Sequence, residues 1–220
     1  MEKGTYHVFV CSRSVEKGQA AVKDLQSRGY SGSCELMQLD QTDDNSINAA
    51  AKHVESNYGH LDVLINNAAI ALVEPTRANM AECFNTNATG IYFVTQAFGG
   101  LLRKSPSTAR VINVSSGLGS IGLKLDHSQL TSAMPILPYS ASKAALSMVT
   151  GQLVFDFKDD NVKFFTVCPG FTVSKLSSQN TTENGATPTD EAVKPLMKIV
   201  TGERDAEASS FLHANGQYPW

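Results

Sequence analysis

This sequence of 220 residues lacks the features that mark several classes of protein. No apolar run approaches the roughly 20 residues that a membrane-spanning helix needs. The first residues also lack the basic and then apolar plan of a signal peptide. A formal net charge of −3 gives no electrostatic reason to expect nucleic acid or an anionic membrane as a partner. We therefore expect a cytoplasmic protein that binds neither a membrane nor nucleic acid.

Metal ligands are scarce as well. The chain has four cysteines and five histidines, and neither set has the spacing of a metal site. We expect no metal, and we expect the cysteines to be reduced thiols that are mostly buried. The chain does have 42% hydrophobic and 18% charged residues, a balance that is typical of a globular protein. Its length fits one domain that covers residues 1–220.

Strands and helices alternate along the sequence. Apolar runs rich in β-branched and aromatic residues predict strands at 6–11, 35–39, 61–65, 110–114, 162–167 and 210–213. Apolar residues at helical spacing predict helices at 15–28, 42–58, 76–103, 139–157 and 190–200. This alternation predicts an α/β fold with a doubly wound parallel sheet flanked by helices. The loop-like stretches 117–138 and 171–188 follow strands, so both should border the ligand crevice of such a sheet.

Tyr139 and Lys143 lie four residues apart in a predicted helix, which puts both side chains on one face. An ammonium near a phenol favours the phenolate and lowers its pKa from about 10 towards neutral pH. Such a tyrosine can give a proton to a carbonyl oxygen or take one from an alcohol. By itself the pair is better explained by an ordinary helix face with a solvated lysine.

Three further patterns set this pair in context. Ser116 follows a predicted strand and precedes a glycine, so its hydroxyl can hold a substrate carbonyl or belong to a common Ser/Gly turn. Asn87 and Gly90 are poor residues for the middle of a helix, which indicates either a kink that positions the amide or a plain surface position. The run 66–69 (Asn-Asn-Ala-Ala) ends a strand with small residues that let a ligand approach the backbone, or it forms an asparagine turn.

Together and in this order, the patterns resemble the core of the short-chain dehydrogenases/reductases. The resemblance covers nearly the whole chain and implies a Rossmann-like fold and an NAD(P)-dependent oxidoreductase that acts on a small hydrophobic ketone, aldehyde or alcohol. It implies Tyr139 as general acid/base, Lys143 as pKa modulator and ribose ligand, Ser116 as the hydroxyl that positions the carbonyl, and Asn87 as a relay that holds a water next to Lys143. It also implies a cofactor cleft that includes Asp40, Asn67, Ala68, Pro169 and Gly170.

The sequence departs from the family pattern at three places. Ala69 stands where glycine is usual, and we expect a small effect. Ser174 stands where threonine is common, and it keeps a hydroxyl for the cofactor carboxamide. The stretch between Ser116 and Tyr139 is longer than usual, as in the carbonyl-reductase-like members, where an insertion covers the pocket and can block helix-to-helix dimerisation. We expect a monomer or a homodimer.

Cofactor choice depends on the residues after the first predicted strand. A carboxylate directly after this strand would repel a 2′-phosphate. The run 11–14 (Cys-Ser-Arg-Ser) contains no acidic residue, and the first acidic residue after it is Glu16. Arg13 offers a planar fork that suits a phosphate, although a solvated arginine explains the sequence about as well. Within the resemblance we expect NADP(H) rather than NAD(H).

The family's first strand and its glycine-rich phosphate loop have no counterpart that we recognise in this sequence. Residues 1–4 resemble the tail of the first helix, so we expect a fold that lacks the first strand–helix unit and its phosphate loop. Two functions remain open. One is an NADP(H)-dependent carbonyl reductase that works by a Ser-Tyr-Lys-Asn mechanism. The other is a non-catalytic or regulatory remnant that cannot hold the dinucleotide. The chain as written should bind NADP(H) poorly.

Overall fold

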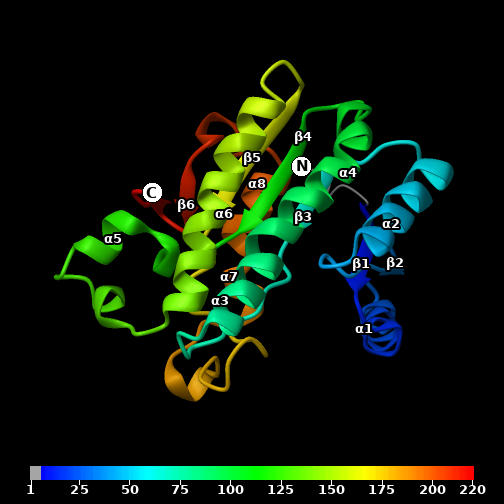
Figure 1. Cartoon of the computed structure of the whole chain (residues 1–220). Helices are drawn as coiled ribbons and strands as arrows, with labels where there is room; N and C mark the ends of the chain where they lie inside the picture. Colours follow the sequence, from blue (N-terminus) through cyan, green and yellow to red (C-terminus); the bar gives the residue numbers. More distant parts are fainter. Residues whose placement is uncertain (1–5) are drawn as a thin grey trace.

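The structure is a computed structural model that describes residues 6–220, and the helix tail expected at residues 1–4 lies outside that range. Its strands form two separate sheets (Figure 1). The first pairs β1 (Tyr6–Ser12) with β2 (Gly32–Gln38) in parallel. The second has the order β3 (Val63–Asn66), β4 (Ala109–Val114), β5 (Val162–Val167), β6 (Phe211–His213) and β7 (Gly216–Gln217). Strands β3 to β6 are parallel, and β7 runs antiparallel to β6.

Helices cover the faces of these sheets. They are α1 (Val15–Ser27), α2 (Asp44–Asn57), α3 (Arg77–Phe84), α4 (Gly90–Arg103), α5 (Ile121–Leu125), α6 (Leu137–Asp156), α7 (Thr189–Ala192) and α8 (Lys194–Val200). In Figure 1, α4 and α6 run in front of the second sheet, α8 lies behind it and α5 projects at the left. Neighbouring strand residues point to opposite faces, so Phe164 packs toward α4 and α6 while Phe165 packs toward α8.

Local signals set most helix ends. The Ser14 hydroxyl accepts the N–H of Lys17 at 3.3 Å and caps α1, and Gly29 follows that helix with a φ of +67°. Helix α2 begins later than expected, because Asp43 rather than Thr42 is its cap. A carboxylate is favoured there because it meets the positive end of the helix dipole.

Other departures from the expected elements have physical causes. The helix expected at 76–103 is interrupted by a π-helix at Asn85–Thr89. The helix expected at 190–200 is divided into α7 and α8, with Pro195 in the first turn of α8, where its missing N–H costs little. The stretch 117–138 contains α5 and two short 3-10 turns, and β7 was not expected at all.

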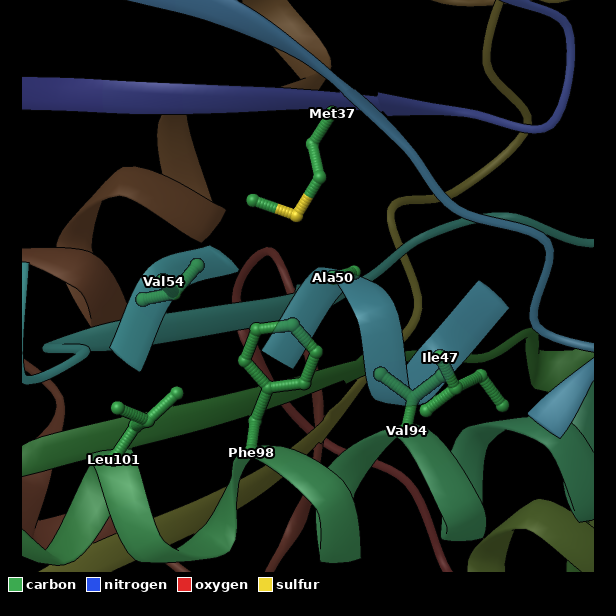
Figure 2. Close-up of a cluster of buried hydrophobic side chains, with 7 residues drawn as sticks. All are labelled: Met37, Ile47, Ala50, Val54, Val94, Phe98 and Leu101. Atoms are coloured by element: carbon green, nitrogen blue, oxygen red, sulfur yellow. The ribbon is translucent and has the colours of Figure 1, made fainter. Parts of the chain in front are cut away.

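The two sheets share one core, although no backbone ladder joins them within residues 6–220. Figure 2 shows Met37 of β2 pointing toward the apolar side chains of α2 and α4. Phe9 of β1 and Leu64 of β3 pack against the same cluster. Val8 and Ile65, on the same two strands, are 48% and 41% exposed, although strands of a doubly wound sheet are normally covered on both faces. The fold therefore has the break expected where the first strand–helix unit is missing.

Candidate active site

The predicted site residues other than Arg13 and Asp40 lie at one edge of the second sheet or on helices next to it. Strands β3, β4 and β5 end there, and the segments that follow them carry Asn67, Ser116 and Pro169. These strands are parallel, so their carboxyl ends meet at the same edge, where doubly wound sheets bind ligands. Helix α6 supplies Tyr139 and Lys143 from its first two turns.

Tyr139 and Lys143 are both buried, with 7% and 2% of their surfaces exposed. The Lys143 Nζ lies 5.8 Å from the centre of the Tyr139 ring, as expected for residues four apart on a helix. That ammonium donates a hydrogen bond to the carbonyl oxygen of Val114 at 2.8 Å. The lysine is therefore not solvated, and the structure excludes an ordinary surface face for this pair.

Burial governs how the two groups titrate. Burial raises the pKa of Tyr139 to about 12, and the nearby Ser116 hydroxyl offsets only part of that rise. Burial also lowers the pKa of Lys143 to about 8. The expectation that the ammonium brings the tyrosine pKa towards neutral pH is wrong for this structure, because loss of hydration dominates the titration of the phenol.

Ser116 lies in the turn that joins β4 to α5. Its Oγ accepts the N–H of Leu118 at 3.3 Å. Gly117 comes directly after Ser116, and its N–H donates to the sulfur of Cys168 at 3.2 Å. This bond connects the turn to the end of β5. Ser116 thus belongs to a Ser/Gly turn and lies near the Tyr139 phenol. Its role in holding a substrate carbonyl stays a prediction.

Asn87 is fully buried in the π-helix that separates α3 from α4. Its Oδ1 accepts the N–H of Ile70 at 2.9 Å, and its Nδ2 donates to the Ile70 carbonyl oxygen at 2.8 Å and to the Ser142 hydroxyl at 2.9 Å. The Ser142 hydroxyl donates in turn to the carbonyl oxygen of Tyr139 at 2.7 Å. The expected irregularity in the helix is present as a π-helix, and the amide reaches α6 through Ser142. Its role as a water relay stays a prediction.

Arg13 and Asp40 lie close together beyond the ends of β1 and β2. The Asp40 Oδ1 accepts the hydroxyl and the N–H of Thr42 at 2.7 and 2.9 Å. These two bonds lower the pKa of the Asp40 carboxyl, and the more distant charge of Arg13 contributes less. Arg13 is exposed and makes no side-chain hydrogen bond or ion pair within the described part of the chain.

The remaining predicted cofactor ligands are mostly exposed and lie at the edge of the second sheet where β3 and β5 end. Asn67 and Ala68 follow β3, and the Ala68 carbonyl oxygen accepts the Gln41 amide at 3.2 Å. Gly170 has a φ of +81°, which suits a residue without a side chain. The Ser174 hydroxyl accepts only a weak bond from the N–H of Leu176, at 3.4 Å. Their roles as cofactor ligands stay predictions.

The expectation that no segment of the sequence has the glycine-rich pattern overlooked residues 117–122, which have the spacing Gly-x-Gly-x-x-Gly and begin three residues after the last residue of β4. All three glycines are used for close packing. A methyl group on Gly117, Gly119 or Gly122 would lie 3.3, 2.6 or 2.8 Å from atoms of Tyr218, Lys143 or Pro219, in that order. The run is therefore filled by neighbouring residues and does not form an open phosphate loop.

A buried polar chain also supports the site without having been singled out from the sequence. Asn66 donates to Asn113 at 2.8 Å, Asn113 donates to Thr150 at 2.9 Å, and Thr166 donates to Thr150 at 3.2 Å. The chain links β3, β4 and β5 to α6 in a core where an unpaired polar group would cost about 1–3 kcal/mol. Asn113 in the apolar run 110–114 was the available signal.

The four cysteines are free thiols, but only Cys83 and Cys168 are buried, so the expectation of mostly buried cysteines is met for half of them. Within residues 6–220, no three or more His, Cys, Asp and Glu side chains gather in a way that could hold a metal ion. None of the helices in that range is long and apolar enough to cross a membrane.

Comparison with known proteins agrees with this geometry. The family model for short chain dehydrogenases matches residues 1–185. The chain belongs to the short-chain dehydrogenase/reductase family. A curated short-chain dehydrogenase/reductase of Aspergillus fumigatus is 34% identical to it over 96% of this chain and 86% of the relative.

Solved structures of carbonyl reductases are similar to this short-chain dehydrogenase/reductase. The NADPH-bound carbonyl reductase from chicken fatty liver superposes with a TM-score of 0.79 at 26% identity, covering 97% of this chain and 87% of that one. The carbonyl reductase Sniffer of D. melanogaster superposes with a TM-score of 0.81 over 100% of this chain and 90% of that one. At 19% identity, the second likeness shows the fold alone. The expected carbonyl-reductase-like resemblance and Rossmann-like fold are confirmed.

Proposed function

We propose that this domain carries the reacting groups of an NADP(H)-dependent carbonyl reductase. The observation that carries the proposal is the convergence of Ser116, Tyr139 and Lys143 at the carboxyl edge of the parallel sheet, with the tyrosine and the lysine buried. Lys143 is buried and meets no carboxylate among residues 6–220, which costs stability, so a functional reason for keeping it is favoured.

The free hydrogen-bonding groups fit the nicotinamide end of a dinucleotide. Lys143 uses one N–H for the Val114 carbonyl and keeps two donors for ribose hydroxyls. The buried Ser115 hydroxyl, next to Ser116, has no hydrogen-bond partner in the described part of the chain. The pyrophosphate finds no comparable cradle there, because the glycine run 117–122 is filled by side chains and backbone.

When bound, the dinucleotide would supply the hydride. In this chain, Ser116 would hold the substrate carbonyl oxygen and Tyr139 would donate its phenolic proton to that oxygen as the alcohol forms. A pKa of about 12 keeps the phenol protonated at neutral pH, which suits the direction of reduction. Leu137 and Phe171, which border this edge, are 57% and 47% exposed and favour a small hydrophobic ketone or aldehyde.

Preference for NADP(H) rests on Arg13, whose guanidinium is exposed and unpaired in the described residues. A 2′-phosphate on the adenosine ribose would give this planar fork a bidentate partner. Asp40 would then contact the adenine. The NADPH in the chicken carbonyl reductase is consistent with this choice.

The break between the sheets favours a second candidate, the non-catalytic remnant. Strands β1 and β3 are not paired to each other, so nothing in residues 6–220 holds the Arg13 side of the crevice to the Tyr139 side by a backbone ladder. We therefore propose that reduction requires a further strand with a glycine-rich turn between β1 and β3. A protein that has that strand but neither binds NADPH nor reduces a carbonyl would support the remnant.

The test is Tyr139→Phe, made in a chain extended upstream of Met1 by such a strand and turn. Reduction of a hydrophobic aldehyde should be lost while NADPH binding stays nearly unchanged, because only the proton donor is removed. Tyr30→Phe, at a tyrosine that is 67% exposed, is the matched control and should have no effect. A kcat near that of the unmodified protein in Tyr139→Phe would contradict the proposed role.

A further inference from the structure

The turn that carries Ser116 lies between α6 on one side and the segment Tyr218–Trp220 on the other. On the α6 side, Gly119 is so close that an added methyl group would lie 2.6 Å from the Cβ of Lys143. On the other side, the Ser120 hydroxyl donates to the Pro219 carbonyl oxygen at 2.6 Å. The turn is therefore held from both sides within four residues of Ser116.

Tyr218 and Trp220 add to the second side. The N–H of Gly122 donates to the Trp220 carbonyl oxygen at 3.0 Å. A methyl group on Gly117 would lie 3.3 Å from the Tyr218 ring, which shows how closely that ring approaches the residue after Ser116. Each residue of the segment 218–220 thus contacts a different residue of the stretch 117–122.

Strand β6 anchors this segment to the rigid sheet. The N–H of Tyr218 donates to the Phe211 carbonyl oxygen at 2.8 Å. The Tyr218 ring stacks on His213 with centroids 4.3 Å apart, and the Trp220 ring stacks on Phe211 at 5.6 Å. Phe211 pairs with Thr166 of β5, so the position of the segment is set by the central sheet.

We propose that Tyr218, Pro219 and Trp220 are positioning residues for Ser116. They press the turn 117–122 against Lys143 and so fix the serine hydroxyl relative to Tyr139. The role assigned to Ser116 rests on the proposed function. The statement that the segment 218–220 holds the turn 117–122 in place does not. If the segment 218–220 served only to cover Phe211, it would not need to approach Gly117 and Gly122 this closely. The close packing against both glycines therefore favours a positioning role. We call this packing of the segment 218–220 against the turn 117–122 the clamp.

Hydrogen exchange of the full chain tests the clamp without any need for activity. Gly122→Ala would place a methyl group 2.8 Å from Pro219 and displace the segment, whereas nothing lies within 4 Å of a methyl group on Gly100. Gly122→Ala and Tyr218→Ala should each speed amide exchange in residues 117–123 by about tenfold or more, since opening would become easier by about 1.4 kcal/mol. Gly100→Ala should leave it unchanged.

Tyr218→Phe should also behave like the unmodified chain, because the Tyr218 hydroxyl makes no hydrogen bond within residues 6–220 and the ring supplies the contact. Exchange in β4 should not change in any variant. Unchanged exchange in residues 117–123 would overturn the clamp, and so would equal acceleration in β4, because that would report general loosening. Trp220 is the only tryptophan in the chain, and its emission gives an independent readout of whether the segment stays docked.

The link to Ser116 is tested in the extended protein that reduces a carbonyl. Tyr218→Ala should lower kcat by about tenfold or more, given that a displacement of about 1 Å can cost a hundredfold, and should leave the KM for NADPH unchanged. An unchanged kcat with a loosened turn would overturn the positioning role. Absence of all reductase activity in the extended, unmodified protein would count against the proposed function, while the exchange result would still decide the clamp.

Discussion

Lys143 shows how far one buried charge can shape the behaviour of this protein. Its ordinary pKa of 10.5 falls to about 8 in the folded chain because burial removes its hydration. Between these two values the unfolded chain binds more protons than the folded one, so stability rises as pH rises from about 8 to 10.5. Below pH 8 the full cost of burying the charge remains.

Replacing Lys143 with methionine should remove this dependence. The free energy of unfolding of the unmodified chain, taken relative to Lys143→Met, should increase by about 3 kcal/mol between pH 8 and pH 10.5, at about 1.4 kcal/mol per pKa unit. Urea denaturation at several pH values measures it. The same substitution at the exposed Lys52 controls for the loss of one lysine. A constant difference across this range would show that the ammonium keeps its hydration.

Arg13 is the residue on which cofactor choice should depend. In the extended chain, Arg13→Asp should weaken NADPH far more than NADH, because it removes an attractive partner of the 2′-phosphate and adds a repulsive one. Fluorescence titration with both cofactors gives the ratio of affinities. Lys17→Asp, at an exposed position in α1, changes the net charge equally and should alter the ratio much less. A ratio that Arg13→Asp leaves unchanged would mean that the guanidinium is only solvated.

At the scale of elements, the π-helix before α4 is held by the loop that leads into α2. The Gln41 side chain donates to the Thr86 carbonyl oxygen at 2.8 Å and to that of Ala68 at 3.2 Å. The Gln41 carbonyl oxygen lies against Gly90, the first residue of α4, where a methyl group would overlap it. The kink that places Asn87 next to α6 therefore depends on a glycine at position 90.

Gly90→Ala should lower the free energy of unfolding by about 1–3 kcal/mol, because the backbone of the loop must move to admit the methyl group. Gly100→Ala, in the same helix, meets nothing within 4 Å and should leave stability unchanged or raise it by up to about 1 kcal/mol. Chemical denaturation of both variants measures the contrast. Equal free energies of unfolding for the two variants would show that the loop at Gln41 can move to admit the methyl group without loss of stability.

The elements that could be predicted were those fixed by neighbouring residues in the sequence. Ser14 and Gly29 mark the ends of α1 by local hydrogen bonding and backbone freedom, and the poor helix formers at 87 and 90 marked the kink. The contact between Ser120 and Pro219 joins residues 99 apart and could not be read from either segment. The titration of Tyr139 was mispredicted for a related reason, since sequence spacing gives the position of a charge but not the extent of burial.

For the whole molecule, we expect the division of residues 6–220 into two sheets to govern whether the protein can bind a dinucleotide. The helices α2 and α4 hold both sheets through one apolar core, so the halves stay together without a shared ladder. The proposed reacting groups belong to the second sheet and to α6, and Arg13 and Asp40 follow the first sheet. A bound dinucleotide would span both parts, and its negatively charged pyrophosphate would need a binding site between them.

Fluorescence titration with NADPH of residues 1–220, beside the chain extended by a strand and a glycine-rich turn, measures whether the two sheets alone can hold the cofactor. We expect binding no tighter than millimolar for residues 1–220 and micromolar binding for the extended chain, because backbone N–H groups at a helix N-terminus would supply a phosphate cradle there. Micromolar binding by residues 1–220 alone would contradict this expectation and would mean that another segment of the chain already holds the pyrophosphate.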